Sequence, residues 1–275
     1  MGIRQMMRHY QTGGLSRELA AARVCQDIVL KAIAASSLSR NVTIKGGVVM
    51  RSLTNNNRRA TKDIDLDFIH YPLNEEMIRL FVERLNCVPD MQIELTGEIE
   101  ELKHQDYHGK RIHVLITDTS GYSVESKIDI GVHKHFDIEQ EEYCFDVCMD
   151  ESGVCLLKNS NEQAFTEKLR SLLKFGTASR RYKDIYDMYY LKDYINSDQL
   201  HSVITQLIFE DTGMRENTYD DIIDRVGKVF RDKIYLQRVS ESRQRWIDLE
   251  IETIAEGILN FMQSVSEIEL GGQVD

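Results

Sequence analysis

The alternation of apolar and polar residues divides the chain into two regions of different periodicity. Up to about Asp150, short segments with alternating or β-rich character predict strands: VTIK, DIDLDFIH, MQIELTGEIEEL, RIHVLITDTS and SKIDIGVHK. Two amphipathic helices are expected among them, one from about Ser16 to Ser37 and one in NEEMIRLFVERLN, entered through Asn74. A mixture of strands with few, long helices indicates an α+β domain.

Beyond this region the strand pattern gives way to helical periodicity. The segments NEQAFTEKLRSLLKFG, RRYKDIYDMYYLKDY, DQLHSVITQLIFE and WIDLEIETIAEGILNFMQSV repeat apolar residues every three or four positions. We therefore expect a mixed sheet with flanking helices in residues 1–155 and a mostly helical domain in residues 156–275.

Composition narrows the class of protein. No run is long and apolar enough to cross a membrane, and the N-terminus lacks the apolar core of a signal peptide, so we expect a cytoplasmic protein that makes no membrane contact. Five cysteines without a regular spacing fit a reducing compartment. A net charge of −11 argues against a protein coated with basic residues.

One local segment is nevertheless basic. Between Leu156 and Lys183 lie seven Lys or Arg residues against two acids. They are either the solvated faces of helices or a contact surface for a phosphate-rich partner. The seven are Lys158, Lys168, Arg170, Lys174, Arg180, Arg181 and Lys183.

The strand DIDLDF concentrates carboxylates on one face. Residues i, i+2 and i+4 of a strand share a side, so Asp63, Asp65 and Asp67 repel one another unless water or divalent cations surround them. A further strand, SKIDIGV, adds Asp129. Carboxylates of two neighbouring strands could hold Mg²⁺ ions that clamp the oxygens of a phosphoryl displacement.

Glycines precede the acidic strand. Gly46 and Gly47 lie between a predicted strand and a helix start, where backbone N–H groups can approach a phosphate closely. The sequence GGVVMRS is neither a P-loop nor a dinucleotide-binding turn, so neither of those two folds is supported.

The combination resembles the AbiEii toxin family of nucleotidyltransferases, which includes the MenT-type toxins and belongs to the DNA polymerase β-like superfamily. The residues that carry the resemblance are KGG, DID, KIDI, the Lys168-Leu169 pair and RRYKDIYD, over roughly Leu15 to Tyr194. The resemblance implies a nucleotidyltransferase-type sheet followed by the helical domain. It further implies an enzyme that transfers a nucleoside monophosphate from an NTP and depends on Mg²⁺, with Mn²⁺ as the alternative.

The resemblance also assigns roles to residues. Gly46, Gly47 and Arg51 would bind the nucleotide, and Asp63 and Asp65 would hold the metal. Asp129 would be a third ligand or the base for the acceptor hydroxyl. Lys168 would contact the triphosphate, and Asp184 or Asp187 would complete the site. Val48 stands where the superfamily often has serine, which leaves more of the phosphate contact to Arg51, Ser52 or Arg58.

Structural alternatives stand beside these roles. The metal pair could be Asp65 and Asp67, Asp129 could be an ion-paired acid at a strand edge, and Asp184 and Asp187 could form surface ion pairs. Cys144, Cys148 and Cys155 lack the spacing of a zinc site, so we expect buried cysteines there.

For the family's toxins the implied acceptor is the 3′ end of tRNA, with a cognate antitoxin encoded alongside. Transfer to a small-molecule or protein hydroxyl is the first alternative. A degenerate protein that binds nucleotide without catalysis is the second.

Overall fold

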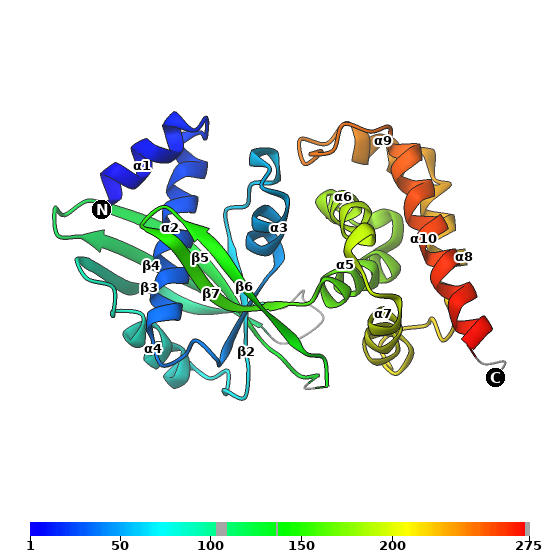
Figure 1. Ribbon diagram of the computed structural model, residues 1–275, viewed down its shortest axis with the longest axis horizontal. Helices are drawn as coiled ribbons and strands as arrows, with labels where there is room; N and C mark the ends of the chain where they lie inside the picture. The colour runs from blue at the N-terminus through cyan, green and yellow to red at the C-terminus, as the bar shows by residue number, and fades with distance from the viewer. Residues whose placement is uncertain (103–108, 136, 273–275) are drawn as a thin grey trace. The chain divides into compact units, whose positions relative to one another are not determined.

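The structure, a computed structural model, describes residues 1–102, 109–135 and 137–272 (Figure 1). The chain divides into two compact units, Met1–Asn159 and Ser160–Asp275. The boundary predicted after residue 155 lies inside a strand, β7, and the first unit extends to the end of that strand.

The first unit is built on one mixed sheet of seven strands in the order β3-β4-β5-β2-β1-β7-β6. The pairs β2–β5 and β1–β7 are parallel, and the other neighbours are antiparallel. The strands are β1 (Val42–Lys45), β2 (Ile64–Phe68), β3 (Met91–Leu102), β4 (Gly109–Asp118), β5 (Ser123–Val132), β6 (Gln140–Val147) and β7 (Asp150–Asn159). The prediction of an α+β fold is confirmed.

Four helices flank this sheet: α1 (Ile3–Thr12), α2 (Arg17–Ala35), α3 (Gly46–Thr54) and α4 (Glu75–Arg84). Helix α2 packs along β5, β6 and β7 (Figure 1). The predicted caps are confirmed, since Ser16 Oγ accepts from the Leu19 N–H at 3.3 Å and Asn74 Oδ1 accepts from the Met77 N–H at 2.9 Å. The sequence pattern predicted neither α1 nor strands β6 and β7.

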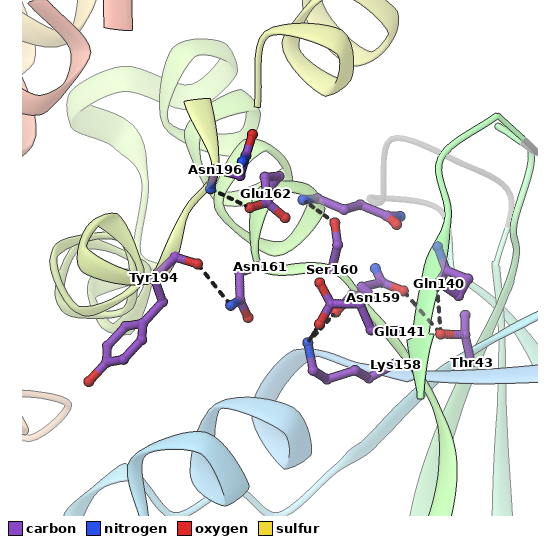
Figure 2. Close-up of polar contacts among 11 residues, drawn as sticks. Thr43, Gln140, Glu141, Lys158, Asn159, Ser160, Asn161, Glu162, Tyr194 and Asn196 are labelled. Carbon is purple, nitrogen blue, oxygen red and sulfur yellow. Dashed lines mark hydrogen bonds and ion pairs between the residues drawn. The ribbon is translucent and has the colours of Figure 1, made fainter. Parts of the chain in front are cut away.

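The two faces of the sheet differ in chemistry. Ile44, Leu66 and Ile128 are fully buried on the apolar face, which belongs to the same core as α2. The opposite face is polar. On it the Thr43 hydroxyl of β1 donates to Gln140 Oε1 at 2.7 Å and lies 3.3 Å from Asn159 Oδ1 (Figure 2). The alternation of strand residues therefore places Asp65 and Asp67 of β2 and Asp129 of β5 on the polar face, away from the apolar core.

The second unit is helical. Its α-helices are α5 (Asn161–Phe175), α6 (Tyr182–Leu191), α7 (Ser197–Ile204), α8 (Tyr219–Phe230), α9 (Lys233–Ser240) and α10 (Ile251–Gly272). Helix α5 packs against α6, α7 and α8, and α10 packs against α6, α8 and α9. No helix within the described residues combines the length and apolar character that a membrane crossing needs.

Polar contacts fix the start of α5. Ser160 caps the helix by accepting from the Gln163 N–H at 3.1 Å. The Asn161 side chain donates to the Tyr194 carbonyl at 3.1 Å, and Glu162 accepts from the Asn196 N–H at 2.8 Å (Figure 2). These bonds tie the first turn of α5 to the segment that leads into α7.

The cysteines differ from expectation. Cys144 and Cys155 lie opposite each other on β6 and β7, and a disulfide joins them. Both side chains are exposed, so the prediction of buried cysteines is wrong for this pair. The reason is the register of the hairpin, which places them together on the polar side of the strands and which spacing along the chain does not reveal.

Gly131 of β5 leaves room for buried polar groups of the neighbouring strands. A Cβ atom at this position would overlap the Asp67 carboxylate and would lie 3.4 Å from the Lys45 ammonium. We expect Gly131→Ala to lower the free energy of unfolding by about 2 kcal/mol, because the added methyl must displace Asp67.

Chemical denaturation measures this change, and Gly227→Ala is the matched control. Gly227 lies inside α8, and the nearest atom to an added Cβ is the flexible end of Arg231 at 3.9 Å. Alanine there should stabilise by about 0.5–1 kcal/mol. Equal effects of the two substitutions would contradict the crowded environment assigned to Gly131.

Candidate active site

A row of charged side chains crosses four neighbouring strands on the polar face of the sheet. The register pairs Lys45 of β1 with Asp65 of β2, Asp65 with Asp129 of β5, and Asp129 with Arg111 of β4. Paired residues of adjacent strands lie about 5 Å apart and point to the same face. The sheet thus brings together two carboxylates that are far apart in the sequence and places a cation on each side of them.

The glycines lie directly beside this row. Gly46 adopts φ +64°, and a Cβ there would overlap the Asp65 carboxylate. A Cβ on Gly47 would overlap the Thr61 side chain. Because both positions lack a side chain, α3 starts against β2, and the Gly47 N–H is 3.5 Å from Asp65 Oδ2. The backbone at the glycines thus approaches the Asp65 carboxylate closely, and the phosphate contact predicted for Gly46 and Gly47 remains a prediction.

Asp65 is in a strained electrostatic environment. Burial raises its pKa, and the nearby charges of Asp129 and Asp63 raise it further. Lys45 and the Gly47 N–H oppose this shift, but the net direction is upward. The three predicted acids therefore lie within electrostatic reach of one another.

Asp129 is bound to arginine. Arg111 Nε donates to Oδ1 at 2.7 Å and Nη2 donates to Oδ2 at 2.8 Å, a bidentate pair. The hydrogen bond to Asp129 is also the main reason that the pKa of Arg111 is raised. Sequence reasoning missed Arg111, because its place opposite Asp129 depends on how β4 pairs with β5.

Asp67 differs from Asp65, the other acid of β2. It is buried, and its carboxylate forms an ion pair with Lys45 Nζ at 2.6 Å. Sequence reasoning also missed Lys45, although this residue immediately precedes the two glycines. Because Asp67 is engaged by Lys45, it is less suited to bind a metal ion than Asp63 and Asp65. The ion pair therefore favours Asp63/Asp65 over Asp65/Asp67 as the metal-binding pair.

The donor set suits a hard divalent cation. Carboxylate oxygens are the protein ligands that Mg²⁺ takes, and the raised pKa of Asp65 shows that added positive charge would be favourable here. As arranged, no three His, Cys, Asp or Glu side chains of the described residues are close enough to hold an ion together. Asp63 and Asp65 fit the cation, whereas Asp129 has both oxygens engaged by Arg111.

The second unit contains its own buried charge cluster. Lys168 of α5 reaches Asp184 at 3.0 Å and Asp187 at 2.8 Å, both on α6. Asp187 is fully buried and also accepts from Trp246 Nε1 at 3.1 Å. Asp184 is partly exposed and lies 3.5 Å from Arg181 Nε. Both acids thus contact the predicted lysine, and Asp187 fixes its position from inside the core.

The basic segment is only partly a surface. Lys158 is buried in β7 and pairs with Glu141, Lys168 is buried, and Arg170 pairs with Asp211. The exposed members are Lys174, Arg180 and Arg181. A phosphate-rich partner would therefore meet fewer charges than the sequence count implies.

Arg51 lies in the last turn of α3, away from the glycines. Five residues of helix correspond to about 7.5 Å along the axis from Gly46. Its Nη2 is 3.4 Å from Ser52 Oγ. The contact predicted between Arg51 and the nucleotide remains a prediction.

We expect Asp187→Asn to destabilise the second unit far more than Asp184→Asn. Loss of the fully buried carboxylate removes one of the two acids that hold the Lys168 ammonium in a largely apolar setting, at a cost of about 3 kcal/mol. Asp184 is closer to water, so its loss should cost about 1 kcal/mol or less. Urea denaturation of both variants tests this, and equal losses would contradict the different burial of the two acids.

The raised pKa of Asp65 predicts that Asp65→Asn stabilises the protein, and that the size of this effect depends on pH. The folded state holds the proton more tightly than the unfolded chain, so ionising Asp65 reduces stability above its ordinary pKa. Asp65→Asn should therefore raise stability, and with it Tm, at neutral pH. The gain should shrink as the pH falls and vanish well below the ordinary pKa of aspartic acid, where the carboxyl group is protonated in both states.

Asp118→Asn is the control, because the pKa of Asp118 is shifted in the opposite direction. Burial raises the pKa of Asp118, but hydrogen bonds from Ser120, Ile3 and Tyr122 outweigh it and hold the pKa below its ordinary value. Asparagine at residue 118 should lower Tm at neutral pH, and the loss should shrink in acid. Thermal melts across this pH range would contradict the assignment if Asp65→Asn behaved like Asp118→Asn.

Comparison with known proteins identifies the family. A model described as nucleotidyl transferase AbiEii toxin, type IV TA system, matches residues 28–260. No curated protein matches the chain. Among solved structures, an antigenic nucleotidyltransferase-like protein from Paracoccidioides brasiliensis is 14% identical with a TM-score of 0.45, over 82% of this chain and 92% of the other.

The antibiotic-resistance factor ANT(2'')-Ia is also 14% identical, with a TM-score of 0.42, over 67% of this chain and 91% of its own. The family match covers most of the chain, including both glycines, the aspartates of β2 and β5, Lys168 and the acids of α6. The chain is a member of the AbiEii family of nucleotidyltransferase toxins of type IV toxin–antitoxin systems.

Proposed function

We propose that this nucleotidyltransferase transfers a nucleoside monophosphate from an NTP to the 3′ end of tRNA, with Mg²⁺ as cofactor. One observation supports the reaction above all others. Asp65 and Asp129 are paired on the polar face of the sheet, directly beside a helix start opened by two glycines, and Asp63, which immediately precedes β2 rather than lying in it, is within electrostatic reach of Asp65. Metal ligands and phosphate-binding N–H groups are the two parts that nucleotidyl transfer needs.

Each residue has a defined task in this proposal. The N–H groups at Gly46 and Gly47 bind the triphosphate, and Asp63 and Asp65 hold the cation. Bound Mg²⁺ would neutralise phosphate charge as it develops on the leaving group. Asp129 serves as a further ligand or accepts the proton of the acceptor hydroxyl, and in either task it must exchange its bond with Arg111.

The bond changes follow from an in-line displacement. The acceptor hydroxyl oxygen bonds to the α-phosphorus, the bond from that phosphorus to the bridging oxygen of the β-phosphate breaks, and pyrophosphate leaves. Lys168 is assigned to the triphosphate by the family resemblance. Its ammonium is held by Asp187 in a fixed position, which suits a cation that must meet charge on the leaving pyrophosphate.

The choice of tRNA as acceptor is the more specific part of the proposal. Lys174, Arg180 and Arg181 offer exposed charge to a polyanion. The toxin family further implies a cognate antitoxin, and we expect the protein to act in the cytoplasm, where tRNA is found. A protein or small-molecule hydroxyl is the alternative acceptor.

Incubation with each α-labelled NTP, total cellular RNA and Mg²⁺ tests donor, reaction and acceptor together. Label in RNA of tRNA size, removed by trimming of the 3′ end, would support the proposal. Label in protein or in a small molecule would move the acceptor to the alternative. Absence of transfer with both Mg²⁺ and Mn²⁺ would favour a degenerate protein that only binds nucleotide.

Substitution of Asp63 and Asp65 should distinguish an effect on the reaction from an effect on stability. Asp63→Ala and Asp65→Ala should each reduce transfer by at least about a hundredfold and abolish growth inhibition, because the cation loses a ligand. Both variants should remain folded, since the lost carboxylates repel one another.

Asp67→Asn is the contrasting variant. It should keep substantial transfer activity but lower stability by about 3 kcal/mol, because it leaves the buried Lys45 without the carboxylate of their ion pair. Activity and circular-dichroism melts of the three purified variants make the comparison. Transfer by Asp63→Ala at the wild-type rate would refute the metal assignment.

A further inference from the structure

The first unit contains a cavity of about 670 Å³ that none of the predicted metal-binding residues lines. Its walls come from α1, the start of α2, the end of α3 and the turn that follows α3. Thr61 forms part of one wall and packs against Gly47, so a single side chain separates this cavity from the glycine turn. The volume is in the range of small-molecule sites.

Arginines dominate the charge of the cavity. Arg8, Arg23 and Arg51 all line it, and Asp146 is the sole acid among the described residues that do. Three guanidinium groups around one concave surface favour an anion, and phosphate matches their geometry best.

Arg23 is fixed in place before any ligand arrives. Its Nε lies 3.2 Å from both the Tyr10 hydroxyl and the Asp27 carboxylate, and Nη2 donates to the Asp146 carbonyl at 2.8 Å. The guanidinium also lies over the Tyr10 ring, 5.4 Å from its centroid. Asp27 is fully buried and holds this arrangement together by accepting from Tyr10 and from the Cys148 N–H. A preorganised cation loses little entropy when it binds an anion.

Several polar atoms of the lining residues have no partner within the described chain. They are Arg23 Nη1, Arg51 Nε and Gln26 Oε1, and all three are buried. Buried polar atoms are nearly always satisfied in folded proteins, so these three show that the residues lining the cavity keep hydrogen-bonding capacity that the described chain does not use.

The remaining lining suits a nucleoside. Asn55, Asn56 and Asn57 follow one another along the cavity, and side-chain amides can donate to and accept from base edges. Leu15 and Leu19 provide apolar surface for a flat ring. An acidic peptide would use the arginines but would leave the amides and the apolar wall without a matching group.

We propose that this cavity is a second nucleotide-binding site, with the phosphate near Arg8, Arg23 and Arg51 and the base against the asparagines. The nucleotide is either free in solution or the terminal residue of an RNA strand. The first source does not depend on the proposed transfer reaction, whereas the second rests on RNA as the acceptor.

Binding to the full chain in EDTA tests the site, because chelation suppresses the metal-dependent site. The probes are the four nucleoside 5′-monophosphates, short single-stranded RNA oligonucleotides with a free 3′ hydroxyl, and inorganic phosphate. Calorimetry should show binding of at least one nucleotide or oligonucleotide. Oligonucleotides that bind about tenfold more tightly than every monophosphate would identify an RNA end, and comparable affinities would identify a free nucleotide.

Matched variants locate the binding. Arg8 and Arg4 are both exposed on α1, but only Arg8 lines the cavity. Arg8→Glu should weaken binding about tenfold or more, and Arg4→Glu should leave it unchanged. Asn55→Gly removes an amide but tolerates the left-handed backbone, φ 46°, of that residue, so it should weaken binding without unfolding the protein.

Asp65→Asn distinguishes this site from the transfer site. It should abolish transfer and retain nucleotide binding in EDTA. Three outcomes would overturn the inference: no binding of any nucleotide or oligonucleotide, wild-type affinity in Arg8→Glu, or inorganic phosphate bound as tightly as the nucleotides. Failure of transfer alone would refute the proposed function and leave this inference intact.

Discussion

The polar face of the sheet depends on the balance of buried charges around Asp65. This carboxylate lies between Lys45 and Asp129 in the strand register, while Arg111 neutralises Asp129 from the far side. Without the two cations, the aspartates of β2 and β5 would face one another in a partly dehydrated environment, and their repulsion would strongly destabilise the folded state. The positions of the lysine and the arginine therefore allow an acidic cluster to exist on a folded sheet.

The same balance explains why the cluster is only partly neutralised. Lys45 is committed mainly to Asp67, and Gly131 leaves room for that pair. The pKa of Asp65 stays raised despite Lys45, which means that its negative charge is incompletely compensated. A residue in this condition favours an incoming cation, so the electrostatic cost in the free protein and the proposed affinity for Mg²⁺ have one origin. The disulfide between Cys144 and Cys155 lies in the β6–β7 hairpin and has no part in this balance.

The helical unit also contains a buried charge, but there the charge is a lysine that carboxylates neutralise. Lys168 is nearly buried, but two carboxylates from the next helix surround it, and Trp246 satisfies the remaining oxygen of the deeper one. The lysine thus has a fixed position and a compensated charge. Asp184, at the more exposed end, is the member of the cluster that can exchange its partner for a ligand with little loss of packing.

Sequence alone determined the parts of this protein that depend on short-range patterns. Period-two alternation identified β1 to β5, capping residues identified the starts of α2 and α4, and the family motifs selected Gly46, Asp63, Asp65 and Lys168. Sequence could also separate the sheet region from the helical region, because strand and helix periodicities differ over any window of a dozen residues.

Tertiary structure decided everything that depends on which strand lies beside which. Arg111 opposite Asp129, Lys45 against Asp67, and Cys144 facing Cys155 are contacts set by sheet order and register. A two-residue shift in register would keep each of these side chains on the same face but give it a different partner, and the alternation along one strand does not specify which strand lies beside it. The cavity beside α1 likewise unites residues of four separate segments, and it exists only once those segments are packed. Local sequence fixes which face of an element is polar, but only the assembled sheet fixes which polar groups meet.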